Sequence, residues 1–160
     1  MTRFSISSAR ARRAGMQLAV AAALIGSGAI TWAQATDSPV GVWRTIDDKT
    51  GKPKALIKIV EQNGEYTGTI VKGLEPNDDP NRVCTACTGA RKGQKMLGME
   101  IMEGIHKDGD VYDGGHILDP ENGMNYSCKL KVVDGGQKLK VRGYLGISLL
   151  GRTQTWIREQ

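Results

Sequence analysis

The chain has 160 residues, of which 22 are lysine or arginine and 17 are aspartate or glutamate, so its net charge is +5 at neutral pH. Four of the basic residues and none of the acidic ones precede Thr36, which leaves residues 36–160 with 18 basic and 17 acidic side chains, a net charge of +1. The aromatic residues of that segment do not alternate with basic runs. This balance argues against a nucleic-acid-binding protein.

The first 35 residues have the pattern of a cleaved export signal. A basic start containing Arg3 and Arg10 precedes a mostly apolar run from Gly15 to Ile30, and Ala33-Gln34-Ala35 fits an A-x-A cleavage site. The apolar run of 16 residues is shorter than the roughly 20 residues that a membrane-spanning helix needs. We therefore expect cleavage after Ala35, a periplasmic location and no membrane-spanning segment. The 125 residues that remain, 36–160, fit a single domain.

The remainder of the chain alternates short strand-like segments with turns. Helical periodicity is weak and glycine is frequent, which favours an all-β fold. Asn63-Gly64 is the strongest turn signal, because a type I′ turn needs positive φ at both central residues. The spacing predicts an antiparallel meander of eight strands: Val40–Ile46, Lys54–Glu61, Glu65–Lys72, Gly98–Ile105, Val111–Leu118, Met124–Val133, Gln137–Tyr144 and Arg152–Arg158.

Eight such strands can form either a sandwich or a closed up-and-down barrel. Closure removes the exposed sheet edges, and strand glycines such as Gly68, Gly114 and Gly143 suit sharply bent strands, so we favour the barrel. Strict alternation marks one face of several strands as inward. The phase of Gly98–Ile105 and of Val111–Leu118 stays undecided, because their apolar residues do not alternate.

Short motifs rich in glycine, aspartate and tryptophan span nearly the whole domain: Gly41-x-Trp43, Asp48-x-Thr50-Gly51, Cys84-x-x-Cys87-x-Gly89, Gly114-Gly115, Asp119-Pro120-x-Asn122-Gly123-x-x-Tyr126, Val141-Arg142-Gly143-Tyr144 and Gly151-Arg152-Thr153-Gln154-x-Trp156-x-Arg158. The set resembles a family of small exported bacterial proteins that carries a domain-of-unknown-function label. That resemblance implies a calycin-type, lipocalin-like barrel and supplies no activity.

The Gly41-x-Trp43 motif also resembles the first-strand signature of lipocalins, in which the tryptophan packs under a basic side chain of the last strand. The resemblance implies that Trp43 and Trp156 help to close one end of the barrel, with Arg152 or Arg158 over the Trp43 indole through a cation–π interaction.

Cys84 and Cys87 lie in the long connection Gly73–Lys95 and allow three interpretations. A redox CxxC motif normally begins a helix, and a zinc site needs four ligands in site-like spacing, whereas a structural disulfide suits an oxidising compartment. Chain entropy favours a bridge to Cys128, about 4 kcal/mol against about 2 kcal/mol for the short ring. Cys128 shares an inward face with apolar residues, so we favour a Cys84–Cys87 disulfide with Cys128 as a buried thiol.

No pattern in the sequence predicts catalysis. Asp47 and Asp48 are turn formers before Gly51, and Gly146–Leu150 lacks the last glycine of a nucleophile elbow. We expect no enzymatic activity, no cofactor and no metal site.

The lipocalin resemblance implies a binding protein for a small hydrophobic or amphipathic molecule. Its candidate ligand-binding residues are inward-facing side chains together with the unusually apolar segment between the last two strands: Ile57, Ile59, Tyr66, Ile70, Tyr126, Leu130, Val141, Leu145, Ile147, Leu149 and Leu150. Three alternatives stay open: a barrel filled by these same residues, an envelope interaction or stress-tolerance protein that presents its loops to a partner protein, and a CxxC-dependent redox protein.

Overall fold

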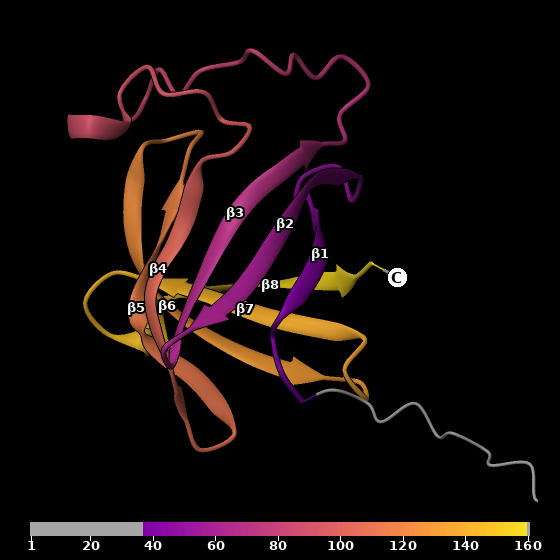
Figure 1. Ribbon diagram of the computed structural model, residues 1–160, viewed down its shortest axis with the longest axis vertical. Helices are drawn as coiled ribbons and strands as arrows, with labels where there is room; N and C mark the ends of the chain where they lie inside the picture. The colour runs from indigo at the N-terminus through magenta and orange to yellow at the C-terminus, as the bar shows by residue number, and fades with distance from the viewer. Residues whose placement is uncertain (1–36, 160) are drawn as a thin grey trace, which may run out of the picture. The chain divides into compact units, whose positions relative to one another are not determined.

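Eight antiparallel strands close into a barrel in the computed structural model, which describes residues 37–159 (Figure 1). Each strand pairs with the next along the chain, and β8 pairs with β1. This arrangement confirms the predicted all-β up-and-down barrel and rules out the sandwich. The expected leader, residues 1–35, lies outside the described residues. The strands are β1 (Gly41–Ile46), β2 (Pro53–Gln62), β3 (Glu65–Gly73), β4 (Glu100–Asp108), β5 (Val111–Asp119), β6 (Met124–Val133), β7 (Lys138–Tyr144) and β8 (Arg152–Arg158).

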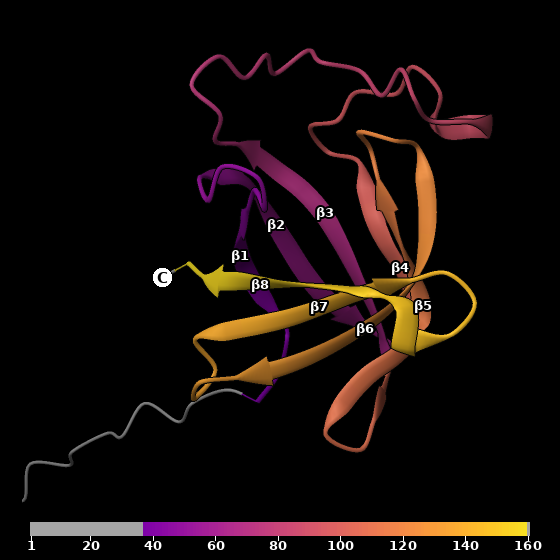
Figure 2. The same ribbon diagram turned by 180° about the vertical axis from the view of Figure 1, so that it is seen from behind.

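The connections divide the barrel into two ends (Figures 1 and 2). Residues 47–52, 74–99, 120–123 and 145–151 join β1 to β2, β3 to β4, β5 to β6 and β7 to β8, and they form the end that we call the mouth. The other three turns are tight and form the closed end. Asn63 and Gly64 make the turn between β2 and β3 with φ angles of 55° and 84°, as the type I′ signal predicts.

Irregular strand pairing explains why the phase of two strands could not be derived from alternation. The register between β3 and β4 shifts around Gly68, and Ile101 and Met102 are both buried although they are adjacent in β4. The register between β5 and β6 shifts between Tyr112 and Gly115. A bulge adds one residue to a strand and reverses the face of every residue beyond it, so period-two patterning fails in these strands.

The closed end is sealed by Trp43, whose indole is fully buried. Its Nε1 donates a hydrogen bond to the carbonyl of Pro39 at 2.7 Å, and the Arg158 guanidinium lies 4.2 Å from the ring centroid. Arg158 also donates hydrogen bonds to the carbonyls of Ser38, Val40 and Gly136, so one side chain ties the N-terminal segment to the turn between β6 and β7. Burial lowers the pKa of Arg158 from its ordinary value.

The long connection between β3 and β4 runs over the turn between β5 and β6 (Figures 1 and 2). Cys84 and Cys87 form a disulfide within it, with their Cα atoms 5.4 Å apart, and Val83 makes an isolated antiparallel bridge with Lys95. A Cβ atom on Gly123, which has a φ of 71°, would overlap the carbonyl of Ala86. The connection is therefore packed tightly against the mouth of the barrel.

Helical structure is slight in the part of the chain that the structure describes. It consists of two 3₁₀ turns, Gly89–Arg91 and Ser148–Leu150. No helix among residues 37–159 has the length and apolar character needed to cross a membrane.

Candidate functional site: a cavity at the mouth of the barrel

A cavity of about 870 Å³ occupies the half of the barrel nearest the mouth. Eight-stranded barrels have room for one small ligand, and cavities of about 300–1,000 Å³ are typical of small-molecule sites. Its deep wall is largely apolar and comes from six strands: Ile57, Ile70, Ile101, Ile117, Val141 and Trp156. Because these side chains come from strands on all sides of the barrel, an apolar group placed among them would be surrounded.

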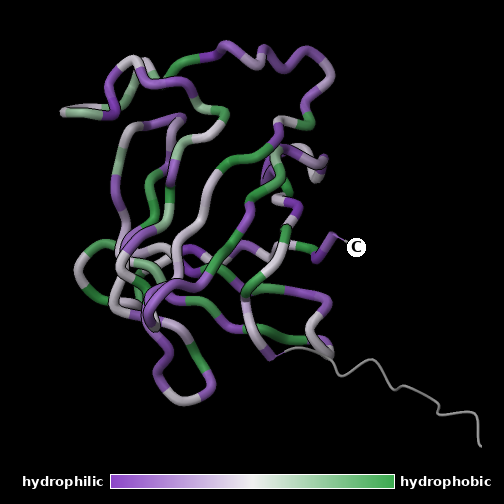
Figure 3. Tube along the Cα trace, viewed as in Figure 1, coloured by the Kyte–Doolittle hydropathy of each residue, from purple (hydrophilic) through white to green (hydrophobic). Residues whose placement is uncertain are grey.

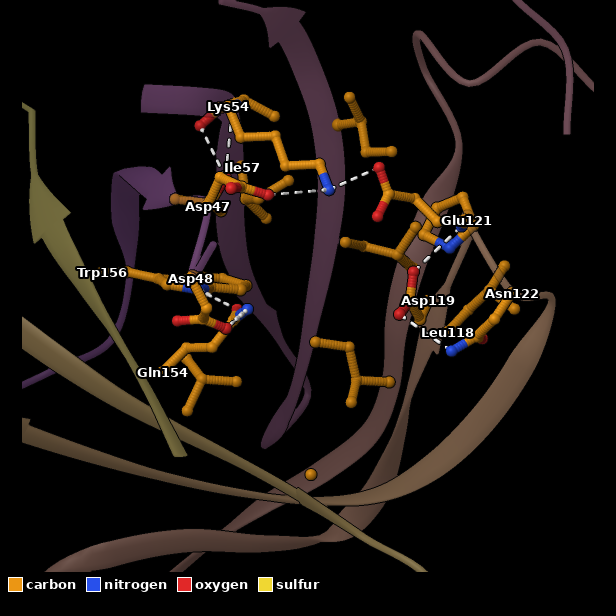
Figure 4. A pocket seen from close by; sticks show the side chains of 18 of the residues that line it. Asp47, Asp48, Lys54, Ile57, Leu118, Asp119, Glu121, Asn122, Gln154 and Trp156 are labelled. Atoms are coloured by element: carbon orange, nitrogen blue, oxygen red, sulfur yellow. Dashed lines mark hydrogen bonds and ion pairs between the residues drawn. The ribbon is translucent and has the colours of Figure 1, made fainter. Parts of the chain in front are cut away.

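Strand β8 gives the cavity one polar wall. Trp156 Nε1 donates a hydrogen bond to Gln154 Oε1 at 3.1 Å, and Gln154 Nε2 donates to Asp48 Oδ2 at 2.8 Å. Asp48 also forms an ion pair with Arg152. Figure 4 shows Asp48 and Gln154 next to the Trp156 ring. Alternate residues of a strand share a face, so Trp156, Gln154 and Arg152 all lie on the inward face of β8. This row of side chains becomes more polar toward the mouth.

An ion-pair bridge crosses the mouth. Lys54 Nζ lies 2.5 Å from Glu121 Oε1 and 3.9 Å from Asp47 Oδ2. Glu121 belongs to the turn between β5 and β6, whereas Lys54 is near the start of β2, and these elements are not neighbours in the sheet. The lysine therefore links opposite walls, as the dashed lines in Figure 4 indicate.

Asp47 and Asp119 are held in place by neutral donors. The side chain and the backbone N–H of Thr50 both donate hydrogen bonds to Asp47, and the side-chain bond contributes most to holding the pKa of Asp47 below its ordinary value. A hydrogen bond from the Lys49 backbone and the positive charge of Lys54 lower this pKa further. Asp119 accepts hydrogen bonds from the backbone of Glu121 at 2.9 Å and from Asn122 Nδ2 at 3.1 Å. Both carboxylates border the cavity. The predicted role of Asp47 as a turn former is consistent with these bonds.

The structure brings six of the eleven candidate wall residues to the cavity: Ile57, Ile70, Tyr126, Val141, Leu145 and Leu150. Ile59, Tyr66 and Leu130 do not line it. Ile59 and Leu130 are buried in the packed half of the barrel near the closed end, and the Tyr66 ring packs edge-on against Tyr112 at 4.8 Å. Alternation shows which face a residue is on, but it does not show how deep in the barrel the residue lies.

Ile147 and Leu149 also lie outside the cavity, because they point into solvent with exposed fractions of 59% and 83%. The 3₁₀ turn that carries Leu149 is held by Arg142, whose Nε and Nη2 donate to the carbonyl of Ser148 at 2.8 and 2.6 Å. Figure 3 shows the segment between β7 and β8 as a hydrophobic stretch at the edge of the barrel. The Leu145–Leu150 segment is thus an apolar lip with a fixed backbone.

Two of the four residues assigned to barrel closure lie elsewhere. Arg158 covers Trp43, but Arg152 is at the mouth in its ion pair with Asp48, and Trp156 forms part of the cavity wall. The reason is the length of β8: its inward face runs from Arg152 at the mouth to Arg158 at the closed end, so only the last arginine reaches the indole.

The cysteines have the expected partners. Cys84 and Cys87 are both buried and form the disulfide. Cys128 is a buried free thiol, and its pKa is raised to about 12, mainly by desolvation and to a smaller extent by the negative charge of Asp113. Burial of both bridged sulfurs disfavours a redox role, since reactive cysteines are at least partly exposed. Among residues 37–159, no group of three or more His, Cys, Asp or Glu side chains is arranged to hold a metal ion.

Sequence reasoning missed the polar residues of the mouth, above all Lys54, Glu121 and Gln154. Gln154 could have been found, because it alternates with Trp156 and therefore faces inward in a strand whose other face carries Thr153 and Thr155. The Lys54–Glu121 pair joins residues 67 positions apart, one at the start of β2 and one in the turn between β5 and β6, and their approach depends on barrel closure. No local pattern predicts such a contact.

Comparison with known proteins supports this architecture. The model of a family described as "uncharacterized protein conserved in bacteria" (DUF2147) matches residues 41–158. The chain belongs to this family. Its fold is similar to that of a solved structure, the protein HP1028 from Helicobacter pylori, which is described as belonging to the lipocalin family. The TM-score is 0.68 at 17% identity, over 78% of this chain and 85% of the other. Among curated protein sequences, none matches this chain.

The likeness to the Helicobacter protein is one of fold, because 17% identity is too low to carry residue roles between the two chains. It confirms the expected lipocalin-like architecture. The family match spans all eight strands, so both ends of the barrel, including Trp43 and Arg158, fall within the shared domain.

Proposed function

We propose that this protein is an exported, non-catalytic binding protein that holds one small hydrophobic or amphipathic molecule in its barrel. The observation that carries the proposal is the cavity of about 870 Å³, apolar at depth and polar at the mouth. Burial of apolar area is worth about 25 cal/mol per Å², so a ligand with an aliphatic or aromatic body gains affinity from the deep wall. A polar group on the same ligand would stay at the mouth, near Gln154 and Asp48.

The arrangement of the ends supports a carrier. Trp43 and Arg158 seal one end, and the apolar lip Leu145–Leu150 borders the other. The described residues that line the cavity include no histidine, cysteine or serine, and its acids and bases are carboxylates and basic side chains, several of which are already joined in ion pairs. We propose binding without chemistry.

Export to the periplasm is part of the proposal. Its support is the pattern of residues 1–35 and the Cys84–Cys87 disulfide, since disulfides persist mainly in oxidising compartments. A second candidate function is an envelope interaction protein, favoured by the exposed lip, where Leu149 and Leu150 are 83% and 78% exposed.

The proposed carrier function can be tested by titrating the protein with N-phenyl-1-naphthylamine. This neutral dye fluoresces in apolar surroundings. We expect saturable uptake of one dye per chain. The double variant Ala55→Trp/Val141→Trp adds bulk at two cavity-lining positions and should abolish uptake. Val60→Trp adds the same side chain at an exposed position outside the cavity and should leave uptake unchanged. Equal uptake by all three proteins, or no uptake by the wild type, would contradict the proposal.

A further inference from the structure

The charges around the mouth are unequal in number and in pairing. Seven carboxylates and four basic side chains line the cavity, a surplus of three negative charges: Asp47, Asp48, Glu75, Asp78, Asp79, Asp119 and Glu121 against Lys49, Lys54, Arg82 and Arg152. The whole segment 36–160 has a net charge of +1, so this surplus is local to the mouth.

The cations of the mouth are mostly neutralised already. Lys54 pairs with Asp47 and Glu121, Arg82 with Glu75, and Arg152 with Asp48. An anionic group arriving at the mouth would have to compete with these carboxylates for their cations. It would also face the remaining negative charges at close range.

A cationic group meets the opposite situation. Within residues 37–159, Asp78, Asp79 and Asp119 line the cavity without a lysine or arginine partner. The ammonium of Lys54 also shows where such a group fits: it sits between carboxylates of opposite walls, above the apolar depth of the cavity. A ligand ammonium at the mouth would meet unpaired carboxylates such as Asp119 without having to break the ion pairs of Lys54.

We propose that the cavity selects amphiphiles with an ammonium head group over those with an anionic head group, because the carboxylates at its mouth outnumber the basic side chains there. This inference rests on the proposed function, because it names the chemical class of the ligand in the same cavity. The apolar tail occupies the wall formed by residues such as Ile57 and Val141, and the charge stays at the mouth.

Three probes with the same ten-carbon tail test the proposal: decylamine, decanol and decanoate, each used to displace the neutral dye at neutral pH and low salt. We expect decylamine to bind at least about tenfold more tightly than decanoate, as two or three partly exposed charge contacts would give, with decanol between them. The preference should shrink as salt is added, because the mouth is open to solvent.

Two variants test whether the carboxylates at the mouth cause the preference for decylamine. In Asp119→Asn/Glu121→Gln the preference for decylamine over decanoate should fall to within about threefold, because two negative charges are lost, while decanol affinity stays the same. Glu100→Gln removes an exposed carboxylate on β4 that does not line the cavity, and it should leave the preference intact.

The outcomes separate this inference from the proposed function. If the dye and decanol bind but decanoate binds as tightly as decylamine, the head-group selectivity is wrong and the carrier stands. A tenfold preference that survives in Asp119→Asn/Glu121→Gln also overturns the proposed head-group site. If neither the dye nor any of the three probes binds, the carrier itself is wrong.

Discussion

Replacing Trp43 with alanine is expected to destabilise the barrel by about 4 kcal/mol. Truncation of a fully buried large aromatic side chain typically costs about 3–5 kcal/mol, because transfer free energy is lost and a cavity remains. The indole also gives up its hydrogen bond to Pro39 and its contact with Arg158, contributions of about 1 kcal/mol each that partly overlap with the first. The value expected for Trp43→Ala therefore lies in the upper half of the range.

For a domain of this size, a loss of about 4 kcal/mol corresponds to a fall in melting temperature of about 15 °C. Far-UV circular dichroism measures it without relying on tryptophan emission. Trp43→Phe keeps a ring beneath Arg158 and should lose only about 1–2 kcal/mol. Val60→Ala, at an exposed position of β2, should change stability by less than about 0.5 kcal/mol. A decrease in melting temperature of less than about 5 °C for Trp43→Ala would refute the role of Trp43 as the seal of the closed end.

Three further predictions follow from other parts of the barrel. Alkylation should label no thiol in the native protein, one thiol (Cys128) after unfolding without reductant, and three after reduction; labelling of native Cys128 would contradict its burial and its raised pKa of about 12. Asp47 has a lowered pKa, so its contribution to stability is present above its unfolded pKa and is lost as pH falls through its folded value; Thr50→Val should move its titration, followed by NMR, upward, and an unchanged titration would contradict the assigned cause. Leu149→Ser/Leu150→Ser should leave the melting temperature unchanged, since both side chains are exposed, and a large fall would show that the lip is part of the core.

The fold was predictable because its signals are local and repeated. Turn residues such as Asn63-Gly64 mark the hairpins, and period-two patterns on β6 and β7 mark the inward face with Leu130 and Val141. The inward faces of β4 and β5 could not be predicted, because both strands contain irregular pairing whose position depends on the partner strand. A single sequence does not contain that information in local form.

The sequence predicted which strand face the residues of the candidate site occupy. It did not predict how deep in the barrel each residue lies, or which polar residues line the mouth. Ile57 and Ile59 are on the same face of β2, yet Ile57 borders the cavity and Ile59 is packed in the core, because the barrel is filled only toward its closed end. The bridge from Lys54 to Glu121 depends on barrel closure, which brings the start of β2 close to the turn between β5 and β6. Such contacts are set by the tertiary structure, and the sequence offers no spacing rule for them.

Native mass spectrometry tests the central claim most directly, namely that the barrel interior holds one small molecule. The protein would be recorded as purified from its host, again after incubation with excess N-phenyl-1-naphthylamine, and finally after denaturation. We predict native species that carry the mass of a single small molecule, either the host ligand or the dye, and a bare chain once the barrel is unfolded. A bare native mass in both samples would contradict the account and would indicate a barrel that acts only through its surface.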